Sequence, residues 1–311
     1  MTEFFKLARL RLELSAALRA APWAIATEYL LALANAVVAA RTAEELKTMS
    51  AVAPKRPASA GDTMAVINLS GVITPKSTLF SMFFGGTALT DFQASLEAAV
   101  NNPKVLAIIL NVDSPGGMVD LVTETAAAIR AAREVKPVVA VANTDAASAA
   151  YWLAAQADEL VVTPSGSVGS IGVYTAHTDF SSWEEQNGQK TTLIAAGKYK
   201  VEGNPYEPLS EEAAAAMQDT VDKYYGMFTG DVAAGRGVSE AAVRNGYGEG
   251  RMLTAEDAKA AGMVDRIATM DDVLAGMAKK LGGSAKAETI VPQTTALKER
   301  ARYEYHRFST S

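Results

Sequence analysis

The chain has 311 residues, of which 49% are hydrophobic and 21% charged, so it is long enough to bury a large core. Its formal net charge of −6 predicts no basic surface for nucleic acid, which argues against DNA or RNA binding. The chain has no cysteine, and its two histidines are His177 and His306. Disulfides, thiol nucleophiles and cysteine- or histidine-rich metal centres are therefore excluded, and we expect no metal and no cofactor.

Residues 1–50 predict an N-terminal helical region, rich in alanine and leucine. The stretch from Ala20 to Ala40 carries one charge, Glu28, and is long enough to span a bilayer. Alanine dominates it and Asn35 lies inside it, which favours a packed or oligomer-forming helix over a membrane span or a signal peptide. Residues 51–62 form a linker of Pro, Ala and Gly.

From Thr63 onward, short apolar runs alternate with helical patterns. Strands are expected at 64–69, 72–73, 105–112, 137–142, 159–163, 170–174 and 191–195. Helices are expected from a capping box at 90–93, at 119–133 and from about residue 148. Repeated strand-helix-strand units imply right-handed crossovers, so the predicted fold class is α/β with a mainly parallel sheet.

Beyond Ser210 the pattern becomes helical. One stripe is predicted to pack in the core, and it consists of Met217, Val221, Tyr224, Phe228 and Val232. An αβ unit at 254–267 and a helix at 270–281 complete a domain spanning 63–281. Residues 282–311 mix charged and polar residues without clear periodicity, so a flexible tail is expected.

Two residues are candidates for nucleophilic catalysis. Ser148 lies among small residues, just before the apolar Tyr151 and Trp152, and Lys200 follows in Gly-Lys-Tyr-Lys. A serine hydroxyl attacks only when a base removes its proton, and a lysine acts as that base only when dry surroundings keep it uncharged. The plainer alternative is that Ser148 caps a helix and that Lys200 is a solvated loop charge.

A glycine pair lies where the strand at 105–112 ends, at Gly116 and Gly117. Glycines at the carboxyl end of a parallel strand leave backbone N–H groups open to a ligand, as an oxyanion hole requires, although an ordinary turn has the same sequence. A second segment of small residues, at 165–172, lies between two predicted strands and is a candidate to approach the nucleophile.

Three alternative assignments remain open at this point. His177 is a possible base in a conventional triad, with Asp145 or Asp179 as its third member. Ser114 is a rival nucleophile, although the proline after it suits a turn better. Lys198 is a rival base, and in an extended segment only one of the two neighbouring lysines can face the pocket.

Four motifs in order resemble the signal peptide peptidase A family of Ser/Lys proteases. They are Ser-Pro-Gly-Gly at 114–117, Ala-Ala-Ser-Ala-Ala-Tyr at 146–151, Gly-Ser-Ile-Gly-Val at 169–173 and Gly-Lys-Tyr-Lys at 197–200. The segments at 250–255 and 262–265 also look like that family and its ClpP/crotonase-fold relatives. The resemblance covers residues 63–270 and implies a ClpP/crotonase-like fold.

The resemblance also implies roles for single residues. Ser148 would be the nucleophile, Lys200 the general base, and Ser170 the hydroxyl that orients the lysine amine. Gly117 and Ala149 would donate the oxyanion N–H groups, with Gly116 beside them. This sequence has alanines around Ser148 where many relatives have glycines, which puts the fit of the substrate in doubt.

Within the family, residues 169–177 and 200–206 look like phage capsid-maturation proteases of the lambda minor-capsid-protein type. This implies a homo-oligomer that processes portal, scaffold or major capsid proteins in the bacterial host cytoplasm or within a prohead or virion. The alternatives are a membrane-associated signal peptide peptidase, a non-catalytic assembly protein on the same fold and an acyl-CoA enzyme of the crotonase type.

Overall fold

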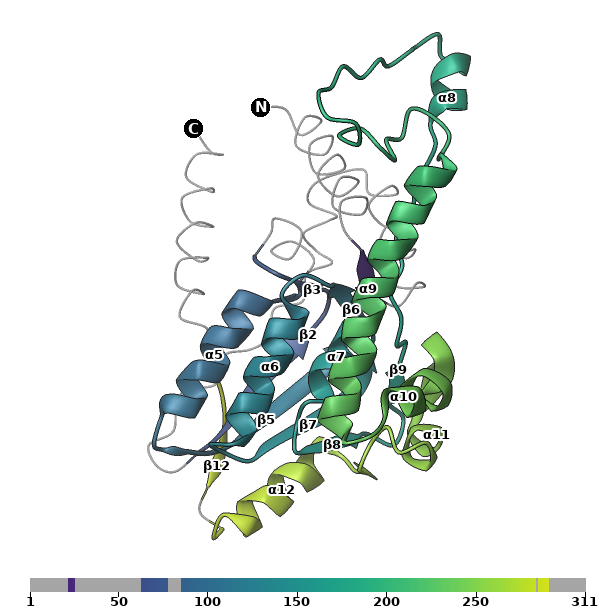
Figure 1. Cartoon of the computed structure of the whole chain (residues 1–311). Helices are drawn as coiled ribbons and strands as arrows, with labels where there is room; N and C mark the ends of the chain where they lie inside the picture. Colours follow the sequence, from purple (N-terminus) through teal and green to yellow (C-terminus); the bar gives the residue numbers. More distant parts are fainter. Residues whose placement is uncertain (1–21, 26–62, 78–84, 284, 291–311) are drawn as a thin grey trace, which may run out of the picture.

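The structure is a computed structural model that describes residues 22–25, 63–77, 85–283 and 285–290, and its fold is α/β (Figure 1). Within these residues the larger sheet consists of β2 (Thr63–Ser70), β5 (Val105–Ser114), β7 (Val138–Ala147), β8 (Glu159–Val162), β9 (Ser167–Gly169), β10 (Met252–Thr254), β11 (Arg266–Ile267) and β12 (Lys286–Thr289). A smaller sheet consists of β1 (Trp23–Ile25), β3 (Ile73–Thr74), β4 (Thr87–Ala88) and β6 (Gly116–Met118).

The larger sheet is mainly parallel and forks at β7. Strands β12, β2, β5 and β7 lie side by side in parallel. The first half of β7 then pairs with β8, and its last three residues pair with β9. Strand β10 is antiparallel to β9, and β11 is parallel to β8. The predicted α/β fold with a mainly parallel sheet is confirmed.

Both faces of the central strands are buried, which explains their continuous apolar sequence. Because side chains alternate along a strand, Ile108 and Leu110 of β5 join the core under one face, whereas Ala107 and Ile109 join the core under the other. Helices α5 (Leu89–Asn101), α6 (Val122–Arg133), α7 (Ala149–Ala154) and α9 (Glu211–Arg236) cover the first face, and α12 (Met270–Lys280) packs on the second (Figure 1). The shorter helices are α8 (Ser181–Gln186), α10 (Glu240–Gly246) and α11 (Ala255–Ala260).

The short helix α7 is held in the core by α6 and α9. The Trp152 ring stacks on Phe228 of α9, with ring centroids 4.4 Å apart. The indole Nε1 donates to the carboxylate of Asp231, 2.8 Å away, and Asp231 also pairs with Arg130 of α6 at 3.0 Å. Gly235 lets the backbones approach closely, since a Cβ there would lie 2.4 Å from the carbonyl oxygen of Ala155. These contacts fix α7, and with it the residue that precedes it.

Several predicted elements differ from the structure. Strand β9 ends at Gly169, so the predicted strand at 170–174 is wrong. The predicted strand at 191–195 is wrong too: its apolar residues have no partner strand, and Ile194 is 97% exposed. Helix α5 begins at Leu89 after an uncapped Ala88, so residues 90–93 form no capping box.

Helix α9 is longer than the surface it covers. Of the predicted core stripe, Phe228 and Val232 are fully buried, while Met217, Val221 and Tyr224 are only half-buried. The reason is visible in Figure 1, where the N-terminal half of α9 extends past the sheet. We call residues 175–227, which comprise α8, the following loop and the first two thirds of α9, the arm.

The chain ends also contain strands that the sequence pattern did not predict. Residues 23–25 form β1 rather than helix, because Pro22 lacks a backbone N–H and Trp23 and Ile25 favour extended structure. Residues 286–289 form β12 against β2 rather than a flexible tail. The rest of the predicted helical region, the linker at 51–62 and residues 291–311 lie outside the described residues. In the described part of the chain, no helix has the length and hydropathy needed to cross a membrane.

The stacked pair between α7 and α9 yields a stability prediction. Phe228→Ala should lower the free energy of unfolding by about 3–5 kcal/mol, because it removes a buried ring and leaves a cavity against Trp152. The neighbouring Met227 is 50% exposed, so Met227→Ala should change the free energy of unfolding by less than about 0.5 kcal/mol. Urea titrations followed by circular dichroism measure both, and equal effects would show that the stack is not a core contact.

Candidate active site

Ser148 occupies the junction between β7 and α7. Its backbone has φ 55° and ψ −119°, a conformation that L-residues rarely adopt and that costs about 1–3 kcal/mol. Its N–H donates to the carbonyl oxygen of Gly169, at the end of β9, over 2.7 Å. A sharp, strained strand-to-helix turn of this kind presents a side chain at the carboxyl edge of a parallel sheet.

The hydroxyl of Ser148 is buried and unsatisfied. The residue is 1% exposed, and its Oγ finds no hydrogen-bond partner among the described residues. It also makes no capping bond to α7, which removes the plainer assignment of Ser148 as a helix cap. A buried hydroxyl without a partner is destabilising, so neither packing nor capping accounts for a serine here.

Gly116 closes the opposite side of the turn. Its φ is +95°, and a Cβ at this position would lie 2.9 Å from the Cβ of Ser148 and 2.9 Å from the carbonyl oxygen of Ala147. Only glycine allows β6 to approach the serine this closely. The Gly116 N–H is already used, because it donates to the hydroxyl of Ser114 at 3.1 Å.

The remaining candidates on the sheet edge lie around Ser148. Ser170 directly follows Gly169 and has a positive φ of 54°, so two strained serines end neighbouring strands. Ala149 is the first residue of α7, and its N–H therefore has no acceptor within the helix. Gly117 follows Gly116 in β6 and pairs with Ile73. The carboxyl ends of β7 and β9 thus meet the amino end of β6 at one place, which carries every predicted site residue except Lys200.

Lys200 lies in the arm, away from Ser148 in the same chain. The arm's loop packs on the first turns of α9, where Lys198 pairs with Glu212, whereas α7 packs on Phe228 and Asp231 of the same helix. At 1.5 Å per residue, Glu212 and Phe228 lie about 24 Å apart along the axis. Lys200 is exposed, and its amine contacts no carboxylate or hydroxyl within the described ranges.

Lys198, the rival base, is engaged elsewhere. Its amine donates to the Tyr199 hydroxyl at 2.7 Å and to the Glu212 carboxylate at 3.0 Å. These hydrogen bonds raise the pKa of Lys198, so the amine holds its proton more firmly than a free lysine does. Its position is that of a structural ion pair within the arm.

The conventional triad is not assembled in this chain. Nε2 of His177 lies 2.9 Å from the carbonyl oxygen of Asn204, inside the arm. Asp145 accepts from the Ser167 hydroxyl, and Asp179 accepts from the N–H of Ser181. The other rival nucleophile, Ser114, is tied into its turn, where its hydroxyl donates to the carbonyl of Gly71 at 2.6 Å. In the part of the chain that is described, no three histidine, aspartate or glutamate side chains are grouped to hold a metal ion.

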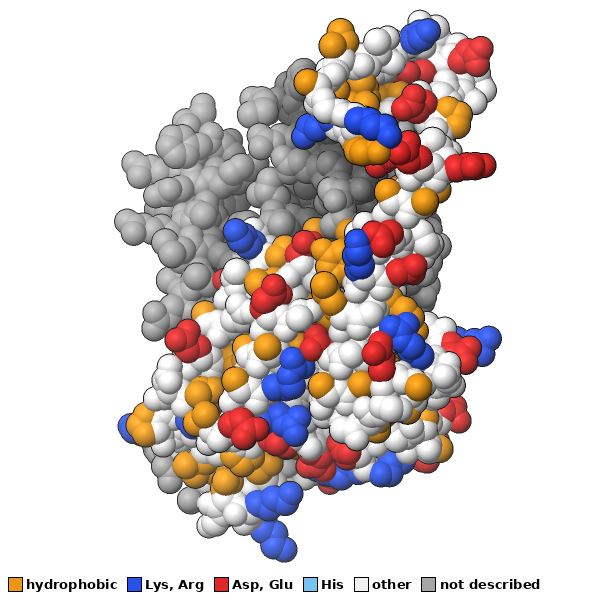
Figure 2. Space-filling view, in the orientation of Figure 1, with side chains coloured by type: hydrophobic (Ala, Val, Ile, Leu, Met, Phe, Trp, Pro, Cys, Tyr) orange, Lys and Arg blue, Asp and Glu red, His pale blue; other side chains and the backbone are white. Residues whose placement is uncertain are grey.

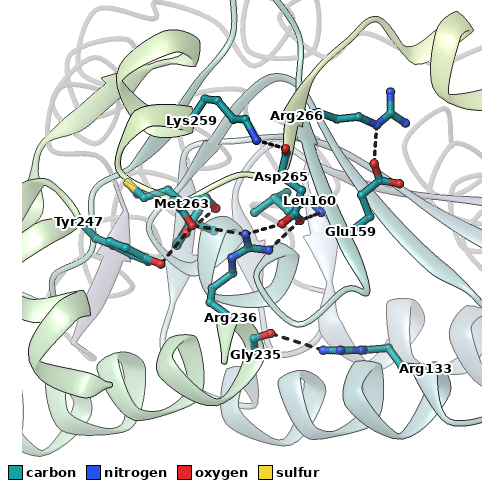
Figure 3. A network of polar contacts seen from close by, with 12 residues as sticks. Arg133, Glu159, Leu160, Gly235, Arg236, Tyr247, Lys259, Met263, Asp265 and Arg266 are labelled. Carbon is teal, nitrogen blue, oxygen red and sulfur yellow. Dashed lines mark hydrogen bonds and ion pairs between the residues drawn. The ribbon is translucent and has the colours of Figure 1, made fainter. Parts of the chain in front are cut away.

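A partly buried polar network anchors the helix that follows Ser148. The hydroxyl of Tyr151 in α7 donates to the carbonyl of Met263 at 2.9 Å, and burial raises the pKa of this hydroxyl, so it stays a neutral donor. Arg236, at the end of α9, binds both carboxylate oxygens of Asp265 at 2.8 Å (Figure 3). Asp265 also accepts from the N–H of Leu160 in β8 at 2.7 Å. The sequence pattern did not single out this network, because its members are far apart in the chain.

The network predicts a dependence of stability on pH. Burial alone would raise the pKa of Asp265, but the hydrogen bonds from Arg236 and Leu160 outweigh it and lower the pKa below its ordinary value of 3.8. The stabilisation is therefore complete above pH 3.8 and is lost as the pH falls toward the folded-state pKa.

Asp265→Asn should be less stable than the wild type at neutral pH. As the pH is lowered to about 3, its free energy of unfolding should fall less steeply than that of the wild type. Urea titrations across this range measure the slope. Asp271→Asn, which changes a surface carboxylate in the first turn of α12, is the matched control. Equal slopes in Asp265→Asn and the wild type would show that the carboxylate is not held by Arg236.

Comparisons with known proteins relate this chain to peptidases. Residues 130–283 match the sequence model described as peptidase family S49. The chain is 33% identical over 214 residues to capsid assembly protease C of Escherichia phage lambda, covering 69% of this chain and 48% of that protein. It is 32% identical over 239 residues to the head-tail preconnector protein GP5 of Enterobacteria phage P21, covering 77% and 47%. Protease 4 of Salmonella typhi is 33% identical over 231 residues, covering 72% and 36%.

The chain spans about half the length of the two phage relatives. A solved structure, the 1510-N membrane protease specific for a stomatin homolog from Pyrococcus horikoshii, is similar with a TM-score of 0.44 at 15% identity, over 76% of this chain and 96% of that one. The chain therefore contains a peptidase family S49 domain, which agrees with the family resemblance of the four motifs.

Proposed function

We propose that this peptidase family S49 domain is a serine endopeptidase in which Ser148 is the nucleophile and Lys200 the general base. The observation that carries the proposal is the Ser148 hydroxyl, which is buried, unpartnered within the described residues and held at a strained strand-to-helix turn. Strain of this kind persists where the surrounding structure enforces it, and it concentrates at reactive groups.

The chemistry follows from the residues around the turn. The Ser148 Oγ attacks the peptide carbonyl, the uncharged lysine amine takes the hydroxyl proton, and the same proton then leaves with the amine product. Water releases the acyl group by the reverse sequence. The N–H groups of Ala149 and Gly117 are the proposed donors to the oxyanion, each worth about 3–4 kcal/mol of barrier. Ser170, on the neighbouring strand end, is proposed to orient the lysine amine.

The position of Lys200 implies that the site is completed by a second copy of the chain. A base must come within hydrogen-bonding distance of the hydroxyl, and the arm of the same chain packs far along α9. The arm exposes large apolar side chains, namely Trp183, Leu193, Ile194, Tyr199, Tyr206, Leu209 and Met227. Figure 2 shows hydrophobic side chains on this face of the arm among charged ones. A projecting apolar surface is typical of a protein–protein interface, and contact with a neighbour would also supply the dry surroundings that a lysine base needs.

The substrates we propose are phage head proteins, such as a scaffold, portal or major capsid protein. The support is the similarity to capsid assembly protease C and to the head-tail preconnector protein. The proposed location is accordingly the host cytoplasm or an assembling prohead. Protease 4 of Salmonella typhi leaves a cellular peptidase as the alternative. Cleavage of coexpressed candidate head proteins, followed by gel electrophoresis, distinguishes the two. Absence of any cleavage of head proteins by an enzyme active on peptides would contradict the phage assignment.

Removal of either dyad member should abolish activity without unfolding the protein. Ser148→Ala and Lys200→Ala should each lower kcat/KM for a fluorogenic peptide by at least about a thousandfold. Lys198→Ala is the matched control, two residues away on the same loop, and should stay within about twofold of the wild type because it loses only exposed contacts to Tyr199 and Glu212. Activity retained in Lys200→Ala would refute the assigned base.

A mixing experiment tests whether two copies share the site. Ser148→Ala keeps its lysine and Lys200→Ala keeps its serine, so random coassembly of equal amounts should restore about one quarter of the wild-type activity. The two variants are coexpressed in equal amounts with the same tag, purified together without selection for mixed assemblies and assayed on the same peptide. Activity no higher than that of either variant alone would show that each chain must supply its own base.

A further inference from the structure

We propose that Trp23–Ile25 is an internal occupant of the peptide-binding edge of β6 and shields Ser148 until a substrate displaces it. The inference rests on the proposed function, because it concerns access to the same serine. Strand β6 pairs with β3 along one edge, so the opposite edge is the one on which an incoming peptide can add as a further strand. In the structure that edge is occupied by the chain's own β1.

The register places β1 over the glycine pair. The two strands are antiparallel, with Trp23 opposite Met118, Ala24 opposite Gly117 and Ile25 opposite Gly116. Gly116 and Gly117 are the residues assigned to the oxyanion side of the site. Figure 1 shows β1, the short purple strand, beside β6 at the end of the larger sheet where β7 leads into α7.

The pairing brings β1 close to the nucleophile. A Cβ placed on Gly116 would lie 2.2 Å from the carbonyl oxygen of Ala24 and 2.9 Å from the Cβ of Ser148, so these two atoms flank one point. Ala24 is fully buried, Ile25 is 2% exposed and Ser148 is 1% exposed. A peptide carbonyl must reach the Ser148 hydroxyl to react, and the backbone of Ala24 lies beside that approach.

The occupant has the properties of a substrate strand. It is extended, and its central residue, Ala24, is small, fully buried and opposite Gly117. It is also short. Because it forms three residue pairs, a peptide that pairs over a longer stretch can compete with it, although the tethered strand has the advantage of a high local concentration. This arrangement would favour extended peptides with small residues near the cleaved bond.

Access to the site can be measured without catalysis. The chain has no cysteine, so Ser148→Cys introduces a single thiol where the nucleophile lies. In this background Ala24→Pro removes the strand's N–H and disfavours its pairing, and it should raise the rate of alkylation by iodoacetamide about tenfold. Ala24→Gly keeps the N–H and is the matched control. Equal alkylation rates in a folded Ala24→Pro protein and its parent would overturn the inference.

A reversible lock provides the complementary test and does not depend on the folding of the proline variant. Trp23 and Met118 are opposed Cα partners, and antiparallel partners lie about 4.5–5.5 Å apart, within the range that a disulfide spans. With Ser148 intact, the oxidised Trp23→Cys/Met118→Cys protein should cleave the fluorogenic peptide at least about tenfold more slowly than the same protein after reduction.

Equal activity of the oxidised and reduced forms would contradict the inference. If neither form nor the wild type cleaves any peptide, the proposed function fails. The alkylation ratio then still decides whether β1 covers residue 148, because that measurement needs no catalysis.

Discussion

The structure depends on the convergence of three strand ends on Ser148. The serine is held at positive φ by the hydrogen bond from its N–H to Gly169, while Gly116 packs against its Cβ and α7 begins at the next residue. A strained residue stays strained only when its surroundings allow no relaxation. The surroundings of Ser148 are a forked parallel sheet on one side and a fully buried helix on the other. The core of the protein therefore maintains the geometry of the site.

The sheet and the helices contribute separately to the geometry of the site. The fork of β7 between β8 and β9 brings two strand ends together at the carboxyl edge, where α/β folds commonly bind ligands. The stack of Trp152 on Phe228 and the network around Arg236 and Asp265 then fix α7 against α9 and β8. The arm contributes little to this core. Several of its large apolar side chains are exposed, which is consistent with the proposal that it joins copies and delivers Lys200.

Local sequence predicted much of the fold but little of the long-range pairing. The strands β2, β5, β7 and β8 and the helices α6, α9 and α12 follow from apolar periodicity, and Gly116, Ser148 and Ser170 meet because parallel strands end at one edge. Residues 191–195 are as apolar as a strand but have no partner strand, so their composition alone predicted a strand that does not form. Strands β1 and β12 pair with residues distant in sequence, although Pro22 before Trp23 was a local sign that a helix could not continue there.

The central claim is that Ser148 is a nucleophile activated by Lys200, and its most direct test is covalent labelling. The full-length protein is incubated with a fluorophosphonate probe and digested, and the modified peptide is identified by mass spectrometry. The account predicts one adduct, on Ser148, that is lost in Lys200→Ala and retained in Lys198→Ala. An unlabelled Ser148, or a label of equal yield in Lys200→Ala, would contradict it.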